Sequence, residues 1–396
     1  MTGALADGLR LGTESAGASI SSPARTSSRK RLAYFAHDLN HADIGRRVDM
    51  LVRGGADVRV LGFHRAAITP ASWVPLGRTK NAKLLQRAIS VLRALATLPR
   101  WVKEVRGADV IVARNLEMLL VAAAARRVAA RDARLIYECL DIHRLMSSSA
   151  AVGAALRTVE RLLMADADGL MVSSPGFVRE YFGRLGARCP KTILIENKVG
   201  VNEDVPPRQA TALPPGPPWR IGWFGVIRCR RSLDILVEAA RRNPGLLEVV
   251  IAGRAAADVV GDLSKELTGV PGVQYVGAFA DEAELARLYR SVHFAWLVDF
   301  YEAGANSDWL LPNRLYRSVY YGAVPIALAH VETGRWLRAK DAGLLLDQAS
   351  ADTVAAAMSQ LGDADYLTAR TRLDGIPTEA LVNGREDCVF LVESLG

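Results

Sequence analysis

One alternation sets the strongest limit on the fold of this chain: short apolar runs typical of strands alternate with amphipathic segments typical of helices. The first series begins with RLAYFA (31–36), continues with the helical segment ADIGRRVDMLVRGG (42–55), and then repeats. Its further strand-like runs are residues 57–63, 108–114, 133–141 and 167–174. Strands that alternate with helices build parallel, doubly wound sheets, so the sequence predicts an α/β fold.

The alternation stops once, at NEDVPPRQATALPPGPP (202–218). Six prolines in these seventeen residues argue against a helix and against a central strand. A second series follows, with strand-like runs at residues 219–225, 247–253, 273–278, 294–300 and 323–329. Two series joined by a proline-rich linker predict two Rossmann-like domains that face each other across a cleft.

These breaks give the expected domain bounds. The first domain is expected at 31–201, the linker at 202–218 and the second domain at 219–375. Residues 376–396 are expected to form a C-terminal helix that packs back toward the first domain. Residues 1–30 are small and polar and lack an apolar core, which predicts a disordered tail rather than a signal peptide.

Composition narrows the range of partners. The 396 residues carry a net charge of +8, which suits nucleic acid, anionic lipid or a phosphorylated substrate. Because nothing else favours nucleic acid, no nucleic-acid partner is expected.

Four distant cysteines, and no His/Cys/carboxylate cluster with ligand spacing, predict no metal site and a reducing cytoplasm. No apolar run is long enough to span a membrane, so at most contact with a membrane surface is expected.

Polar side chains follow the predicted strands of the first domain, where open α/β sheets bind their ligands. His37, Asp38, Asn40 and His41 come after the first strand, and Arg114 and Asn115 follow a later one. Two interpretations stay open: these residues cap the helices that follow, as Asp and Asn often do, or they line a site.

Asp141 and His143 leave the strand at 133–141 together. They could serve a sugar hydroxyl as acceptor and as base or donor, and a capping or buried structural role is the alternative.

The second domain has a cationic turn. Arg228, Arg230 and Arg231 lie between a strand and a helix, where cations are unfavourable unless an anion offsets them. Helix N-termini and arginines both bind phosphate, so a phosphate site is predicted here. Gly253 ends the strand at 247–253 and would let a ligand or another backbone approach closely.

Two further segments stand out. The run DFYEAGANSDWLLPNRLYRSVYYGAVPIAL (299–328) concentrates acids, amides, aromatics and cations before an apolar strand. The segment 79–107 is helical, with basic residues and Trp101 beside one apolar stripe: Leu84, Leu85, Ala88, Ile89, Leu92 and Leu95. A packed helix is the simplest interpretation of this stripe, and docking on anionic lipid is the alternative.

With both series in view, residues 31–396 resemble the GT-B glycosyltransferases of family 4, and among them the bacterial exopolysaccharide enzymes of succinoglycan-biosynthesis type. The resemblance rests on YFAHDLN, ARNLEML, YECLDIHR, SSPGFVREYF, IENKV, GWFGVIRCRRSLDIL and EAGANSDWLLPNRLY...GAVPIAL. It implies that the second domain holds a nucleotide diphosphate sugar and that the first meets the acceptor. The implied acceptor-side residues are His37, Asp38, Asn40, Arg114 and Asn115.

The donor-binding motifs of the family match this sequence in part. The family places a glycine, an arginine and a lysine around the donor diphosphate. Here Gly225 matches, Val226 stands where the arginine usually is, Arg231 replaces the lysine, and Arg228 could supply the missing cation. The second donor motif fits in most positions: Pro312, Asn313, Arg314, Leu315 and Tyr316, with Gly322 and Pro325 fixing the register.

The position that departs from the motif is 317. The family has a glutamate there that accepts hydrogen bonds from the ribose hydroxyls, whereas Arg317 offers no acceptor. Three interpretations stay open: Arg317 pairs with Glu302 or Asp308, it binds a phosphate or the carboxylate of a uronic-acid donor, or donor binding is weakened. Glu302 is assigned to the transferred sugar or the diphosphate region, with Asp308 second.

The remaining assignments follow the same resemblance. Asn306 and Asn313 could hydrogen-bond donor hydroxyls, and Asp141 and His143 match an Asp-x-His pattern near the acceptor. In an inverting enzyme Asp141 is the candidate base, and in a retaining enzyme the leaving diphosphate can take the acceptor proton.

The chain is therefore expected to be a Leloir-type glycosyltransferase. It would move a hexose or a uronic acid to a lipid-linked saccharide in exopolysaccharide assembly, at the inner face of a bacterial membrane and without a metal. Two alternatives stay open: a catalytically silent glycan-binding or scaffold homologue, and a nucleotide-sugar epimerase. A phosphorylase is disfavoured because Lys265 and Lys340 are the only lysines after residue 218, and neither lies in a persuasive site.

Overall fold

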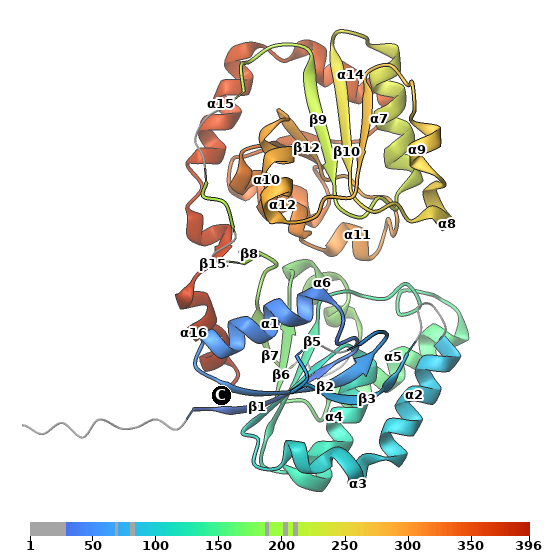
Figure 1. Cartoon of the computed structure of the whole chain (residues 1–396), viewed down its shortest axis with the longest axis vertical. Helices are drawn as coiled ribbons and strands as arrows, with labels where there is room; N and C mark the ends of the chain where they lie inside the picture. Colours follow the sequence, from blue (N-terminus) through green and yellow to red (C-terminus); the bar gives the residue numbers. More distant parts are fainter. Residues whose placement is uncertain (1–28, 68–69, 80–83, 187–189, 201–204, 209–212) are drawn as a thin grey trace, which may run out of the picture.

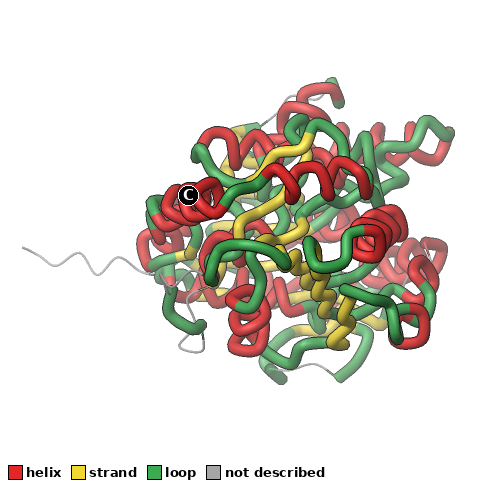
Figure 2. The backbone as a smooth tube through the Cα atoms, turned by 90° about the horizontal axis from the view of Figure 1, so that it is seen from above, coloured by secondary structure: helices red, strands yellow, loops and turns green. Residues whose placement is uncertain are grey.

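The computed structural model describes residues 29–67, 70–79, 84–186, 190–200, 205–208 and 213–396. Most of the predicted tail (1–28) and parts of the predicted linker (201–204 and 209–212) lie outside these residues. Two α/β domains are stacked along the long axis of the molecule (Figure 1). Viewed down that axis, strands occupy the middle and helices lie on both sides of them (Figure 2).

The first domain is built on a seven-stranded sheet of order β3-β2-β1-β4-β5-β6-β7, in which every neighbouring pair is parallel. Its strands are β1 (Arg31–Ala36), β2 (Asp57–His64), β3 (Val74–Arg78), β4 (Val110–Arg114), β5 (Arg134–Cys139), β6 (Gly169–Val172) and β7 (Lys191–Leu194). Its helices are α1 (Ala42–Arg53), α2 (Leu84–Ala96), α3 (Leu98–Trp101), α4 (Leu116–Ala129), α5 (Ala151–Met164) and α6 (Pro175–Glu180), with 3-10 turns η1 (Val102–Val105) and η2 (Phe182–Arg184).

The second domain repeats this plan with a six-stranded parallel sheet of order β11-β10-β9-β12-β13-β14. Its strands are β9 (Trp219–Phe224), β10 (Leu247–Ala252), β11 (Val273–Gly277), β12 (Phe294–Trp296), β13 (Val324–Leu328) and β14 (Leu344–Leu346). Its helices are α7 (Arg230–Arg242), α8 (Ala257–Val260), α9 (Leu263–Glu266), α10 (Glu282–Arg290), α11 (Asn306–Trp309), α12 (Asn313–Tyr321), α13 (Glu332–Ala339), α14 (Ala351–Gln360) and α15 (Asp363–Asp374). The predicted fold of two Rossmann-like domains is confirmed.

The chain end crosses back to the first domain. After the 3-10 turn η3 (Thr378–Ala380), β15 (Val382–Asn383) pairs with β8 (Val199–Gly200), and α16 (Arg385–Ser394) follows. Leu391 of α16 is buried in the same apolar cluster as Leu51 of α1. At Gly54 a Cβ would come 2.2 Å from the carbonyl oxygen of Cys388, so this close packing requires glycine at position 54. The last helix therefore completes the core of the first domain.

The two domains also touch directly beside the cleft. Trp309 and Leu310, at the end of α11, pack against the apolar core of the first domain. The Ser174 hydroxyl donates to the Trp309 carbonyl oxygen (2.5 Å), and Arg179 of α6 pairs with Glu332 of α13 (2.5 Å). Segment 299–310 of the second domain is thereby fixed against the carboxyl ends of the first sheet.

Candidate active site in the interdomain cleft

The carboxyl ends of both sheets border one cavity of about 440 Å³, within the range usual for small-molecule sites. Both domains supply its polar lining: His41, Asp43, Arg114, Asp141 and Asn197 from the first, and Gly225, Arg228, Glu282, Asp299, Asn313, Arg314 and Arg317 from the second. The sequence thus identified six residues that the structure brings together here: Arg114, Asp141, Arg228, Asn313, Arg314 and Arg317, besides Gly225.

Gly225 and Gly253 directly follow the neighbouring strands β9 and β10, and their backbones lie in close contact. Their φ angles are +128° and +135°, which favour glycine. A Cβ at position 253 would lie 1.7 Å from the Gly225 carbonyl oxygen, so Gly253 makes room for the Gly225 backbone. Gly225 lines the cavity and Gly253 does not, so packing, and not ligand contact, accounts for Gly253.

The cations predicted to bind phosphate separate into two places. Arg228 faces the cavity, whereas Arg231 lies over the Phe300 ring (3.9 Å from its centroid) on another surface. The cation–π contact with Phe300 explains this placement of Arg231. Arg230 is paired with Glu266 (2.6 Å) and also points away. Of the three arginines, Arg228 alone borders the cleft.

A second guanidinium, that of Arg314, borders the cavity close to Arg228. Arg228 Nη2 and Arg314 Nη2 lie 3.6 and 3.8 Å from the same Asp299 oxygen, distances too long for strong hydrogen bonds. Nη1 of Arg314 is buried and has no hydrogen-bond partner in the part of the chain that is described. Burial lowers the pKa of Arg314, and the Asp299 carboxylate opposes that shift. Two cations therefore share one carboxylate, which leaves positive charge facing the cavity.

Arg317 has a partner that the sequence did not predict. Its Nε and Nη2 donate to Oε1 and Oε2 of Glu282 (both 2.8 Å), and the Tyr321 hydroxyl donates to Oε1 (2.9 Å). Burial raises the pKa of Glu282, but Arg317 and Tyr321 act more strongly in the opposite direction, so this pKa lies below its usual value. Pairing of Arg317 with Glu302 or Asp308 was wrong, because Glu282 at the start of α10 lies closer.

Asp141 and Asn306 connect the two domains at the other end of the cavity. Asn306 Nδ2 donates to Asp141 Oδ1 (3.4 Å), and Asn306 Oδ1 accepts from the Ile142 amide (2.9 Å). Burial raises the pKa of Asp141, and the hydrogen bond from Asn306 opposes the rise. Glu302 lies near this pair, and burial likewise raises its pKa, although its side chain does not line the cavity. Through these two hydrogen bonds, Asn306 of the second domain holds Asp141 and the following residue of the first domain in place.

A buried network holds Arg114 at the cavity wall. Glu138 accepts from Arg47 Nε (2.7 Å) and from the Tyr34 hydroxyl (2.5 Å), and Arg114 Nη1 lies 3.5 Å from that hydroxyl. Burial raises the pKa of Glu138, but the charges of Arg47 and Arg114 lower it by more, so this pKa lies below its usual value. The fixed negative charge of Glu138 supports Arg114 beneath the cleft.

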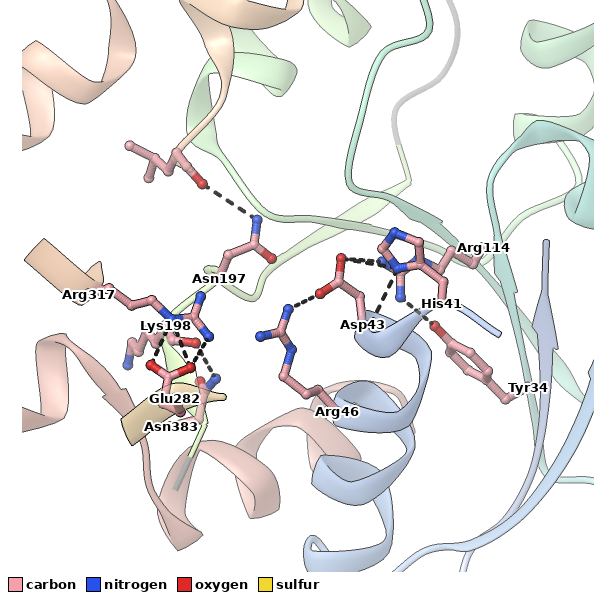
Figure 3. A network of polar contacts seen from close by, with 11 residues as sticks. Tyr34, His41, Asp43, Arg46, Arg114, Asn197, Lys198, Glu282, Arg317 and Asn383 are labelled. Atoms are coloured by element: carbon pink, nitrogen blue, oxygen red, sulfur yellow. Dashed lines mark hydrogen bonds and ion pairs between the residues drawn. The ribbon is translucent and has the colours of Figure 1, made fainter. Parts of the chain in front are cut away.

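Two residues at the start of α1 also line this wall: His41, which the sequence grouped with His37, Asp38 and Asn40 but gave no role, and Asp43, which it missed. His41 Nδ1 accepts from the Asp43 amide (3.3 Å), and Asp43 pairs with Arg46 across one turn (Figure 3). Arg46 points toward Glu282 and Arg317, and burial followed by repulsion from Arg317 lowers the pKa of Arg46 to about 10. An N-cap histidine facing a cleft cannot be distinguished from an ordinary cap in the sequence.

Other residues that were predicted to bind donor or acceptor make structural contacts instead. Asp38 pairs with Arg65 (3.2 Å), and Asn40 Oδ1 accepts from the amides of Arg65 and Ala66, so both hold the loop after β2. Tyr316 is fully buried with its ring against Trp336.

Four more lie outside the cavity lining. Asp308 accepts from the Gly304 amide (2.9 Å), and His143 accepts from the Leu145 amide (3.3 Å). Asn115 stands at the start of α4 with φ +72° and makes no side-chain cap. His37 is largely buried, and burial, reinforced by Arg114, holds its pKa well below the usual range.

Known proteins share this architecture. A sequence match to the glycosyl transferase 4-like domain spans residues 42–198. Sucrose-phosphate synthase from Thermosynechococcus elongatus superposes with a TM-score of 0.64 over 93% of this chain and 95% of its own, at 18% identity. Anabaena Alr3699/HepE in complex with UDP-glucose gives a TM-score of 0.61 over 92% and 98%, at 15% identity. The fold is that of the GT-B glycosyltransferases, as predicted.

A closer relative in sequence is the succinoglycan biosynthesis protein ExoL of Rhizobium meliloti (strain 1021). It is 40% identical over 374 residues, which cover 92% of this chain and 93% of the relative. The chain belongs to the glycosyltransferase family that includes ExoL, and the prediction of a glycosyltransferase is confirmed.

Proposed function

We propose that this glycosyltransferase moves a hexose or a uronic acid from a nucleotide diphosphate sugar to a saccharide acceptor in exopolysaccharide assembly. The observation that carries the proposal is that one cavity joins the excess cations Arg228 and Arg314 of one domain to Asp141 of the other. The relationship to ExoL, a succinoglycan biosynthesis protein, supports the pathway, and the likeness to HepE, which was solved with UDP-glucose, supports the donor class.

On this proposal, Arg228 and Arg314 bind the donor diphosphate. Charge-assisted bonds between guanidinium and phosphate are shorter and stronger than the loose contacts that both arginines make with Asp299. The same two cations stabilise the charge that develops on the leaving diphosphate. Among the described residues no group of three His, Cys, Asp or Glu side chains is placed to hold a metal, and we propose that the arginines make a metal unnecessary.

Asp141 is assigned to the acceptor. Four carboxylates line the described cavity, and three of them are paired with cations: Asp43 with Arg46, Glu282 with Arg317, and Asp299 with Arg228 and Arg314. Asp141 makes no ion pair with a described residue and is held by Asn306. A carboxylate without a cation, with its pKa raised by burial, is the group best suited to take a proton from an acceptor hydroxyl.

A transfer assay tests the function. The full-length protein is incubated with EDTA, a membrane lipid extract and one nucleotide sugar at a time, and products are read by mass spectrometry. We expect one donor to yield a lipid-linked product larger by one hexose or uronic acid. An isomerised nucleotide sugar without transfer would indicate an epimerase, and no binding of any nucleotide sugar by calorimetry would indicate a silent homologue.

We further propose that the first domain contacts an anionic membrane from the cytoplasmic side. No described helix is long and apolar enough to cross a bilayer. The apolar stripe predicted on 79–107 does not pack as expected: Ile89 and Leu92 of α2 are 39% and 64% exposed, and the packed face instead carries Val91 and Ala94. Lys80 and Lys83 of this segment lie outside the described residues.

Helix α5, which like α2 packs on α4, also exposes apolar side chains. Val152, Val159 and Leu162 recur on its outer face and are 58%, 41% and 67% exposed, while Leu156 and Leu163 pack on the same core as Leu95 of α2. Arg93 on α2 and Arg161 on α5 are exposed. Glu160, the single acidic residue of these two helices, is buried. Within α2 and α5, exposed apolar side chains lie beside cations and no carboxylate is exposed, and Glu117 of the adjoining α4 is neutralised by Arg87. Such a surface suits anionic lipid.

Vesicle sedimentation tests this contact. We expect the protein to bind phosphatidylglycerol vesicles and not phosphatidylcholine vesicles, and a Leu92→Glu/Leu162→Glu variant to bind about tenfold more weakly because two apolar anchors are lost. Phe390→Glu is the matched control, since Phe390 is 55% exposed on α16, which covers the opposite face of the sheet. Equal binding by all three proteins would contradict the proposal.

A further inference from the structure

A second cavity lies beside β8 and β15, where the chain crosses between the domains, and we call it the crossover cavity. Its volume is about 430 Å³, and its walls are α1, residues 196–200 and the start of α16. It adjoins the candidate active site, because five residues line both cavities: Asp43, Arg114, Leu140, Asn197 and Asn313. The proposed transfer assigns no donor or acceptor contact to the residues that line the crossover cavity alone.

Basic side chains outnumber carboxylates on the walls of the crossover cavity. Six of them line it: Arg46, Arg47, Arg53, Arg114, Lys198 and Arg385. Three carboxylates do so: Asp43, Asp49 and Glu196. Two more carboxylates pair with this set from outside the lining, Glu138 with Arg47 and Asp387 with Lys198. Six cations therefore meet five carboxylates, and burial raises the pKa of Glu196, which works against the negative charge there.

Arg46 is only partly neutralised by its partner. It pairs with Asp43, one turn away on α1. That carboxylate is shared, because Arg114 Nη2 lies 3.9 Å from its Oδ2. Arg46 extends from α1 toward Arg317 (Figure 3), and burial followed by repulsion from Arg317 lowers the pKa of Arg46 to about 10. An anion beside Arg46 would stabilise its positive charge.

Three further side chains on the walls have hydrogen-bond donors to give. Arg385, the first residue of α16, is exposed and makes no hydrogen bond or ion pair with a described residue. Asn197 Nδ2 donates to the Leu311 carbonyl oxygen over 3.5 Å. Asn383 Nδ2 donates to the Lys198 carbonyl oxygen over 3.4 Å. Both distances exceed the usual range for N–H···O bonds, so these amides are only loosely engaged.

We propose that the crossover cavity binds a compact phosphate-bearing anion, with Arg46 and Arg385 as its main contacts. Guanidinium groups match phosphate oxygens in bidentate geometry. None of the described residues that line the cavity is aromatic, and its apolar members are Met50, Leu140 and Cys388, so a nucleotide base would find little surface to pack on.

This site is distinct from the proposed donor site. Arg228 and Arg314, which are assigned to the donor diphosphate, line the active-site cavity and not the crossover cavity. The inference therefore goes beyond the proposed transfer and does not depend on it.

The anion is assigned to a soluble small molecule rather than to a lipid headgroup. Helices α1 and α16 pack on the apolar cluster at one face of the first sheet. Helices α2 and α5, which are proposed to contact the membrane, pack on the cluster at the other face. The crossover cavity thus lies away from the proposed membrane surface.

Calorimetric titration of inorganic phosphate into the full-length protein tests this inference. The protein is first saturated with UDP or GDP, which occupies Arg228 and Arg314, and chloride keeps the ionic strength constant. We expect the wild type to bind phosphate at one site, and Arg46→Gln to bind it at least about tenfold more weakly because charge-assisted hydrogen bonds are lost. Arg385→Gln should also bind more weakly.

Arg241→Gln is the matched control, because it breaks an exposed pair with Glu238 on α7 and should bind phosphate as the wild type does. No phosphate binding by the saturated wild type, or equal binding by the wild type and Arg46→Gln, would overturn the site and leave the transferase intact. Loss of phosphatidylglycerol vesicle binding in Arg46→Gln would overturn the assignment to a soluble anion.

Failure of the proposed donor gives a different result. If neither UDP nor GDP binds, the donor proposal fails, and phosphate is titrated into the free protein instead. Weaker phosphate binding in Arg46→Gln but not in Arg228→Gln would then still support the crossover cavity, whereas the reverse pattern would overturn it.

Discussion

Replacing Arg228 with glutamine is expected to lower kcat/KM for transfer by about 100-fold or more, because one of the two cations facing the leaving diphosphate is lost. Removal of a single preorganised donor at a developing charge commonly has an effect of this size. Little change in thermal stability is expected, since the Arg228 side chain is 39% exposed and its contact with Asp299 is 3.6 Å long. Initial rates with the donor found by the transfer assay provide the measurement.

Arg231→Gln is the matched control for this variant. Arg231 is three residues away, carries the same charge and lies over Phe300 outside the cleft. It should retain nearly all of the activity. Equal losses in the two variants would mean that a general electrostatic field, rather than direct contact with the diphosphate, explains the effect of Arg228.

The sequence predicted the central strands and the edge strand β11, but it missed the edge strands β3, β7 and β14. β1, β4 and β13 are buried along almost their whole length and read as continuous apolar runs. The edge strands β3 and β7 have one neighbour each, and most of their residues are at least partly exposed, so they carry no such run and were not predicted. β12 ends at Trp296, earlier than expected, although the Leu297 amide still donates to the Ile326 carbonyl oxygen of β13 (3.0 Å).

Site residues were predictable from the sequence where they directly follow a strand. Asp141 and Arg228 follow strands of different domains, and the topology alone brings them to one cleft. Contacts between elements were not predictable in this way. That Arg317 would meet Glu282, 35 positions earlier, depends on how α10 packs on α12, and no local pattern encodes that distance.

The remaining wrong assignment, that of Arg231 to the phosphate site, arose because neighbouring arginines look alike in a sequence. Arg228, Arg230 and Arg231 are equivalent in the sequence, but the helical turn at the start of α7 directs them to different surfaces. Arg314 looked like a conservative replacement within a motif, and the structure shows a buried nitrogen on it that has no partner among the described residues. A cluster of arginines in a sequence predicts an anion site. Which of the arginines can contact the anion depends on the direction of each side chain in the fold.

Replacing Asp141 with asparagine is expected to reduce kcat by about 100- to 10,000-fold, the range usual for loss of a positioned proton acceptor. Asparagine has the shape of aspartate and can still accept the hydrogen bond from Asn306, so the loop that Asn306 holds should stay in place. The loss should therefore appear in kcat more than in nucleotide affinity.

The pH profile distinguishes a proton acceptor from a positioning role. Burial raises the pKa of Asp141 above its ordinary value, so the carboxylate form is lost as the pH falls through that raised pKa. The wild type should lose activity on the acid side earlier than an ordinary aspartate would dictate, and the residual activity of Asp141→Asn should not show that acid limb. Asp308→Asn is the control, because Asp308 binds the Gly304 amide outside the cavity and should keep both rate and profile. An Asp141→Asn variant with nearly full kcat would assign the acceptor proton to the leaving diphosphate and reduce Asp141 to positioning the acceptor.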